Sequence, residues 1–84
     1  MYQNPIIEKD LHGLTVEQAV TEIEKLLKQA GTGTYRIRLI HGYHRGNRIQ
    51  EAIYDEFGYG MHEKVIRVTG GTNPGITELV LREY

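Results

Sequence analysis

The sequence predicts an α+β fold, a two-layer sandwich in which a four-stranded mixed sheet carries two helices on one face. Three observations predict it. Apolar residues recur at helical spacing in two segments, they alternate or cluster in four shorter segments, and glycine-rich turns separate the segments in the order β-α-β-α-β-β. With 84 residues, the chain is long enough for a single domain over residues 1–84 and too short for two.

Composition limits the classes of function. A hydrophobic share of 39% and a charged share of 25% are typical of an ordinary globular domain. The chain has no cysteine, which excludes disulfides and thiolate zinc sites and leads us to expect a cytoplasmic protein. No apolar run approaches membrane-spanning length, so we expect no membrane partner. The net charge of −1 argues against a strongly basic nucleic-acid binder but allows a local basic face.

The first strand follows a short lead-in over residues 1–5, where Pro5 cannot donate to a strand ladder. Apolar residues around Glu8 predict a strand that ends at His12-Gly13. The first helix is predicted from about Val16 to Ala30, because Thr15 begins a capping-box pattern and apolar residues then recur at helical spacing. We expect Gly31 to end this helix in a left-handed conformation.

The second strand covers residues 35–40, where apolar and basic residues alternate, and it runs directly into His41-Gly42. Asn47 is placed to cap the second helix. Its expected buried stripe is Ile49, Ala52, Ile53 and Phe57, and Gly58 and Gly60 are expected to end it.

Two further strands are predicted over residues 62–69 and 76–82, joined by a turn over residues 70–75. Right-handed crossovers make the first two strands parallel. If the third strand runs with them, three polar segments meet at the carboxyl edge of the sheet, where open α/β sheets bind ligands. These segments are residues 10–13, 40–48 and 70–75.

Three motifs carry a family resemblance. They are Asp-Leu-His-Gly-Leu-Thr at residues 10–15, Ile-His-Gly at residues 40–42, and Asn-Pro-Gly-x-Thr-x-Leu-Val-Leu at residues 73–81. Together, and in this order, they resemble the small MutS-related (Smr) domain. The resemblance implies a fold like the C-terminal domain of translation initiation factor three. It also implies DNA or RNA binding, and several members of the family have endonuclease or nicking activity.

The chain departs from the family pattern at two positions. Lys9 stands where the family usually has leucine, and His44 stands where the second motif usually ends in glycine. The resemblance therefore implies binding more directly than it implies catalysis.

Histidines and one aspartate are the candidate catalytic residues: Asp10, His12, His41 and His44. Asp10 and His12 are two apart, so on a regular strand they share a face. This spacing suits a carboxylate that orients a general acid or base, or two ligands of a divalent metal. A purely structural pair that closes the turn before the helix is the alternative. Whether the domain uses a divalent metal as a cofactor is left open. Histidines on separate loops without a fixed spacing are a weak indication of a zinc site, so we assign no metal ligand.

The candidate nucleic-acid contacts are Gly42, Tyr43, Arg45, Gly46, Arg48, Asn73, Gly75 and Thr77. The arginines would hydrogen-bond to phosphates, and Tyr43 would stack on an unpaired base. The glycines of residues 42–46 would allow the nucleic acid to approach the backbone closely. Asn73, Gly75 and Thr77 would add amide and hydroxyl groups, although Asn-Pro-Gly is first of all a turn. A solvated loop without a ligand is the alternative. Arg36 and Arg38 are expected to serve solubility rather than to extend a phosphate track.

Three functions follow as hypotheses. The first is an Smr-like nucleic-acid-binding domain with DNA or RNA endonuclease activity. The alternative is a non-catalytic module that binds nucleic acid or a ribonucleoprotein partner. The third is a protein-interaction domain that keeps only the fold. The sequence distinguishes neither DNA from RNA nor one oligomeric state from another.

Overall fold

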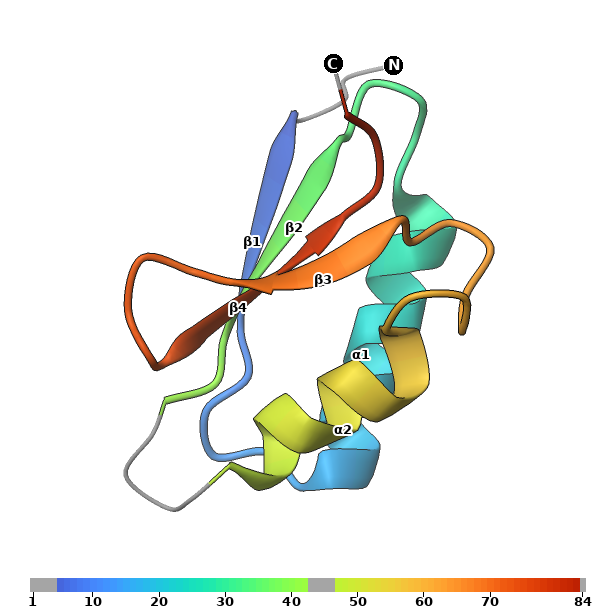
Figure 1. The fold of residues 1–84 in the computed structure, drawn as a ribbon. Coiled ribbons are helices and arrows are strands. Elements are labelled where there is room, and N and C mark those ends of the chain that lie inside the picture. Colours follow the sequence, from blue (N-terminus) through green and yellow to red (C-terminus); the bar gives the residue numbers. More distant parts are fainter. Residues whose placement is uncertain (1–4, 43–46, 84) are drawn as a thin grey trace.

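The fold follows the predicted order of elements. The computed structural model describes residues 5–42 and 47–83. Within them the chain forms β1 (Ile6–Asp10), α1 (Val16–Gln29), β2 (Arg36–Ile40), α2 (Arg48–Phe57), β3 (Arg67–Gly70) and β4 (Ile76–Val80) (Figure 1). The α+β class and the β-α-β-α-β-β order are thereby confirmed.

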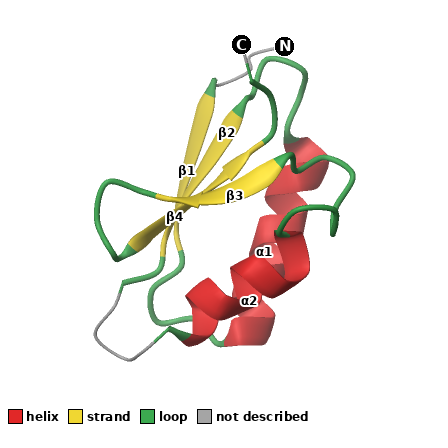
Figure 2. Ribbon diagram, viewed as in Figure 1, coloured by secondary structure: helices red, strands yellow, loops and turns green. Residues whose placement is uncertain are grey.

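The strands form one mixed sheet in the order β1-β2-β4-β3. β1 and β2 are parallel, whereas β4 is antiparallel to both of its neighbours, β2 and β3. β3 therefore runs in the same direction as β1 and β2. Both helices lie on one face of this sheet, and the other face carries no helix (Figure 2).

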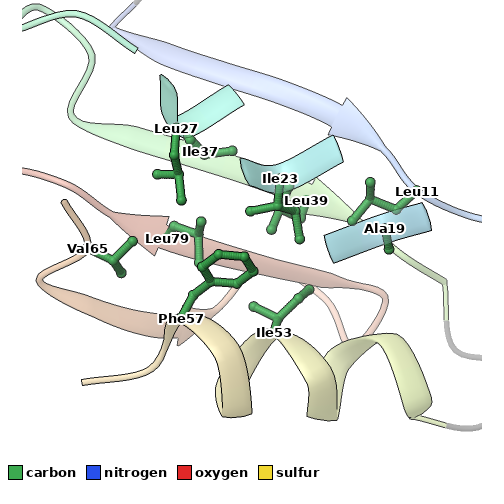
Figure 3. Packing of buried hydrophobic residues seen from close by; sticks show 10 residues of the cluster. All are labelled: Leu11, Ala19, Ile23, Leu27, Ile37, Leu39, Ile53, Phe57, Val65 and Leu79. Carbon is green, nitrogen blue, oxygen red and sulfur yellow. The ribbon is translucent and has the colours of Figure 1, made fainter. Parts of the chain in front are cut away.

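The core lies between the helices and the sheet, as Figure 3 shows for its members. The helix-facing positions of adjacent strands are in register, with Ile7 opposite Ile37 and Ile37 opposite Leu79. The buried core cluster consists of Leu11, Ala19, Ile23, Leu27, Ile37, Leu39, Ile53, Phe57, Val65 and Leu79. Both helices contribute residues three or four apart, which is the spacing that puts side chains on a single helix face.

Three local expectations were wrong. α1 ends because Ala30 turns extended, with φ −65° and ψ 123°, and among the described residues the glycines with positive φ are Gly13, Gly42 and Gly60, so Gly31 is not the left-handed stop. Asn47 occupies the N-cap position of α2, but its side chain makes no capping hydrogen bond. β3 starts at Arg67, not at residue 62.

The late start of β3 has a local cause. After Gly58 ends α2, the chain makes two more turns, with the Met61 amide donating to Gly58 O (2.9 Å) and the Val65 amide donating to His62 O (3.1 Å). These turns direct Val65 into the core, where it is buried. The apolar residues Val65, Ile66 and Val68 therefore lie partly at the end of a turn and partly at the beginning of a strand.

Both ends of the described chain meet beside the start of β2. The backbone amide of Tyr35 donates to Pro5 O (2.9 Å), and the carbonyl of Tyr35 accepts from the amides of Leu81 (2.8 Å) and Arg82 (3.3 Å). The first described residue and the segment after β4 are thus hydrogen-bonded to a single residue. Figure 1 shows them at the end of the sheet remote from the loops that follow β1 and β2.

Candidate functional site

Three loops share one edge of the sheet, as the parallel direction of β1, β2 and β3 requires. We call it the loop edge and define it by residues 10–13, 41–42 and 71–77 (Figure 1). The loop after β1 is joined to the end of β2, because the Leu11 amide donates to Ile40 O over 2.7 Å. The end of β2 is joined to the start of β4 through hydrogen bonds between their backbones. The described parts of the three polar segments, residues 10–13, 41–42 and 71–75, therefore meet as predicted.

Asp10 and His12 form an exposed pair at the loop edge. One carboxylate oxygen, Asp10 Oδ1, lies 3.0 Å from the backbone N of His12 and 2.6 Å from its Nδ1. A carboxylate can only accept hydrogen bonds, so the Nδ1 atom of His12 carries the proton that it donates to Asp10. The second ring nitrogen, Nε2, takes no part in this pair. The side chains are 54% exposed for Asp10 and 74% exposed for His12. The hydrogen bonds from the His12 side chain and backbone hold the pKa of Asp10 below its usual value.

The backbone around this pair is fixed from both sides. Leu11, between the two residues, is fully buried and anchors the loop in the core. Gly13 then takes φ +83°, a left-handed conformation that favours glycine. Thr15 caps α1 with a complete capping box, in which its hydroxyl accepts from the Gln18 amide at 3.1 Å and the Gln18 side chain accepts from the Thr15 amide at 3.0 Å. The strand end, the glycine and the cap together aim the pair outward.

His41 differs from His12 in that both of its ring nitrogens are engaged. Nδ1 lies 2.7 Å from the carbonyl oxygen of Gly42, and Nε2 lies 2.7 Å from Thr77 Oγ1. Neither nitrogen is left over for proton transfer to a ligand. The geometry therefore does not favour the catalytic role predicted for His41, and it gives this residue a place in the framework of the loop edge.

Thr77 and Gly75 are also built into this framework. The Thr77 side chain is fully buried with its hydroxyl on His41. The carbonyl of the buried Gly75 accepts from the amides of His41 (2.9 Å) and Gly42 (3.0 Å), and its own amide donates to Asn73 Oδ1 (2.8 Å). The groups that these two residues were predicted to offer to nucleic acid are already used within the protein. Asn73 is exposed, and its side-chain oxygen closes the turn.

The remaining predicted contacts divide into two groups. Arg48 is exposed as the first residue of α2, and Gly42 takes φ +75° with open space where a Cβ would lie. Gly42 is part of the loop edge and Arg48 follows it in the chain, and the contacts predicted for both remain predictions. Tyr43, His44, Arg45 and Gly46 lie outside the described residues, so the roles predicted for them remain predictions from sequence.

The described residues contain no group of three or more histidine, aspartate or glutamate side chains that could hold a metal ion. Asp10 and His12 could supply two ligands at most, and the His12 Nδ1 atom already faces the carboxylate. The donor set in this part of the chain therefore does not make a metal centre by itself.

Glu78 is the polar residue that the sequence did not single out. Its side chain is on the helix-free face of the sheet, yet the residue is only 3% exposed. Arg36 Nη1 lies 2.6 Å from one carboxylate oxygen and Arg38 Nε lies 2.9 Å from the other. Arg36 and Arg38 are thus ion-paired within the sheet. In the sheet, Arg36 lies opposite Val80 and Arg38 lies opposite Glu78 on β4. The ion pairs could have been predicted from the sequence only with knowledge of this strand register.

Comparisons with known proteins agree with this architecture. The family model described as the Smr domain matches residues 9–72, a range that includes the Asp10 and His41 motifs. A solved crystal structure, the Smr domain of MutS2 from Thermus thermophilus, is similar to this chain with a TM-score of 0.77 and 29% sequence identity. The similarity covers 92% of this chain and 99% of that chain. No curated protein matches this sequence.

Neither helix in the described part of the chain has the length and apolar character needed to cross a membrane.

Proposed function

Because the chain belongs to the Smr domain family, we propose that it binds DNA or RNA through the loop edge and cleaves a phosphodiester bond there with the Asp10–His12 pair. The observation that carries the proposal is the exposed His12 ring. Its Nδ1 is held by Asp10, while its Nε2 has no protein partner among the described residues. An accessible imidazole of defined tautomer next to a carboxylate is the arrangement that general acid–base catalysis requires.

In the proposed reaction His12 Nε2 accepts the proton of the attacking hydroxyl group of water or of a ribose. The oxygen of that group bonds to phosphorus, the bond from phosphorus to the leaving oxygen breaks, and the leaving oxygen takes a proton from solvent. Asp10 keeps the ring oriented and stabilises the imidazolium that forms. General acid–base catalysis contributes about 10²- to 10⁴-fold to a rate. His12→Ala should therefore lower the cleavage rate by about that factor and leave the binding affinity close to its original value.

Positive charge beside the loop edge supports the binding half of the proposal. Arg48 opens α2 and is exposed there. A phosphate contact from an arginine adds to affinity without reading the base sequence and makes binding sensitive to salt. Arg48→Glu should weaken binding and lower the slope of log affinity against log salt by about one.

The same charge reversal at Arg82 is a matched control. Arg82 is exposed after β4, beside Tyr35 and at the opposite edge of the sheet. Arg82→Glu changes the net charge by the same amount and should preserve the salt slope if the loop edge is the interface. An equal effect of both variants would indicate a general effect of charge.

The test combines binding and nicking assays on supercoiled plasmid and on structured RNA, with Mg²⁺ and with a chelator. Binding is measured at low salt, where attraction to phosphate is strongest. The enzyme proposal requires that Asp10→Asn and His12→Ala both lower the nicking rate strongly, with the His12→Ala loss at about 10²- to 10⁴-fold, and that both retain binding. If the wild-type chain shows no binding at low salt to either nucleic acid, the whole proposal is wrong.

A non-catalytic module is the second candidate, and the engagement of His41 favours it. Phosphodiester cleavage commonly uses both an acid and a base, and both ring nitrogens of His41 are occupied by Gly42 and Thr77. This candidate predicts binding without cleavage under every metal condition. It also predicts that binding survives His12→Ala.

A further inference from the structure

His41 has a defined tautomer. The partner of its Nδ1 is the backbone carbonyl oxygen of Gly42, 2.7 Å away, and a carbonyl oxygen can only accept a hydrogen bond. The proton of a neutral His41 ring is therefore on Nδ1. Nε2 then carries a lone pair and accepts from the hydroxyl of Thr77, also at 2.7 Å.

The buried hydroxyl of Thr77 hydrogen-bonds to the His41 ring and is not available to a ligand. This threonine lies in β4 opposite Leu39 of β2 and Gly70 of β3, and its side chain is fully buried. A buried hydroxyl without a partner is destabilising, and His41 is the partner that satisfies this one. A valine would fill the same volume without the hydrogen bond.

The backbone next to the ring is held by the same cluster. The amides of His41 and Gly42 both donate to Gly75 O, at 2.9 and 3.0 Å, and Gly42 takes φ +75°. The ring of His41 then binds the carbonyl of Gly42 from the other side. Contacts with His41 and Gly75 thus hold both the amide and the carbonyl group of Gly42. They fix the backbone at the point where the chain leaves the sheet.

We propose that Thr77 is a positioning residue, which holds His41 so that the ring fixes the backbone at Gly42 and presents the loop edge to nucleic acid. His12, at the neighbouring strand end, keeps its Nε2 atom accessible. The effect on nucleic acid depends on the function proposed above, whereas the state of the His41 ring can be measured without any ligand.

The first experiment uses the unaltered chain. Long-range ¹H–¹⁵N correlation spectra at mildly alkaline pH, where histidine side chains are ordinarily neutral, report which ring nitrogen carries the proton. We expect the Nδ1–H tautomer for His41, with Nε2 showing the shift of a hydrogen-bonded lone pair. Finding the Nε2–H tautomer would overturn the proposal, and this result does not depend on any variant being able to fold.

The second experiment compares Thr77→Val with Thr77→Ser, and Thr69→Val on β3 is the matched control for a change from threonine to valine. Thr77→Val should move the Nε2 resonance of His41 to that of a lone pair without a donor and weaken nucleic-acid affinity about fivefold, as expected for a lost hydrogen bond. Thr77→Ser should restore both properties, and Thr69→Val should change neither.

The outcomes separate this proposal from the function on which it rests. If Thr77→Val retains the wild-type affinity, or if Thr77→Ser is as impaired as Thr77→Val, Thr77 is not a positioning residue. If the unaltered chain binds no nucleic acid, the proposed function fails. The tautomer and the Nε2 resonance still decide whether Thr77 holds the His41 ring.

Discussion

The buried carboxylate of Glu78 and the guanidinium of Arg38 form a hydrogen-bonded ion pair on the sheet face that neither helix covers, with 2.9 Å between Arg38 Nε and Glu78 Oε2. Arg36 completes the site by donating to the other carboxylate oxygen. Two cations therefore satisfy one buried anion, and each arginine side chain keeps about a third of its surface in water. The pair joins β2 to β4 on the face opposite the core.

Glu78→Gln should destabilise the domain by about 1–3 kcal/mol, because it removes the negative charge that both arginines face and turns an amide NH2 group, a hydrogen-bond donor, toward one of them. The free energy of unfolding, measured by urea denaturation at neutral pH, checks this expectation. Glu63→Gln, at an exposed position, is the control and should stay within about 0.5 kcal/mol. Equal effects of the two substitutions would contradict a stabilising role for the ion pair.

Stability should fall in acid, and Glu78 should account for part of the loss. Burial alone would raise the pKa of Glu78, but hydrogen bonds and charge from Arg38 and Arg36 outweigh it and hold the pKa below its usual 4.5. A carboxyl group with a lowered pKa stabilises the fold above its unfolded-state pKa, and this contribution is lost as the pH falls through the lower pKa of the folded state. The pKa of Asp10 is also lowered, so it acts with the same sign.

Denaturation curves recorded from pH 7 down to about pH 2.5 would show this loss beginning below about pH 4.5. Glu78→Gln should flatten the acid limb of the curve. A variant with the slope of the wild type would show that other carboxylates govern the acid limb.

Gly13→Ala should destabilise the domain by about 1–2 kcal/mol. The cause is conformational, since Gly13 has φ +83° and a Cβ there would meet nothing within 4 Å. Gly70 is the matched control, because a Cβ at that position is also free of contacts and its φ lies outside the left-handed region. Thermal unfolding should show a loss for Gly13→Ala and little change for Gly70→Ala. Similar losses in both would indicate that the strain at residue 13 is not the cause.

Thr15→Ala should cost about 0.5–2 kcal/mol, because it removes the N-cap hydrogen bond to the Gln18 amide. Thr21→Ala, at an exposed position inside α1, makes the same change of side chain where alanine favours the helix. Thermal unfolding should therefore move in opposite directions for the two variants. A Thr15→Ala variant as stable as the wild type would show that the capping box contributes little.

Local patterns in the sequence account for most of the fold. α1 was predicted to within one residue at its end, because a 14-residue helix with a capping box repeats its signal over several turns. β3 was misplaced because it has only four residues, and the segment over residues 65–68 has no alternation that separates turn from strand. The direction of β3, which decides whether three loops meet, was left as a condition at the level of sequence, and it follows from the antiparallel pairing of β4 with both β2 and β3.

The candidate site divides in the same way. Asp10 and His12 are two residues apart, so their contact could be inferred from spacing. His41 and Thr77 are 36 residues apart, and only the register of β2 against β4 brings them together. The same register brings Glu78 to Arg38. The sequence therefore did not predict whether the ring nitrogens of a histidine at a strand end are hydrogen-bonded within the protein.

The hydrogen bonds of Tyr35 to Pro5 and to Arg82 have a practical consequence for anyone who handles this domain. They gather both ends of the described chain at the edge of the sheet away from Asp10 and His12 (Figure 1). A dye or a surface tether attached at Pro5 or at Arg82 would therefore lie on the far side of the sheet from the surface proposed to bind nucleic acid. Protein immobilised through either residue should leave the loop edge facing solution.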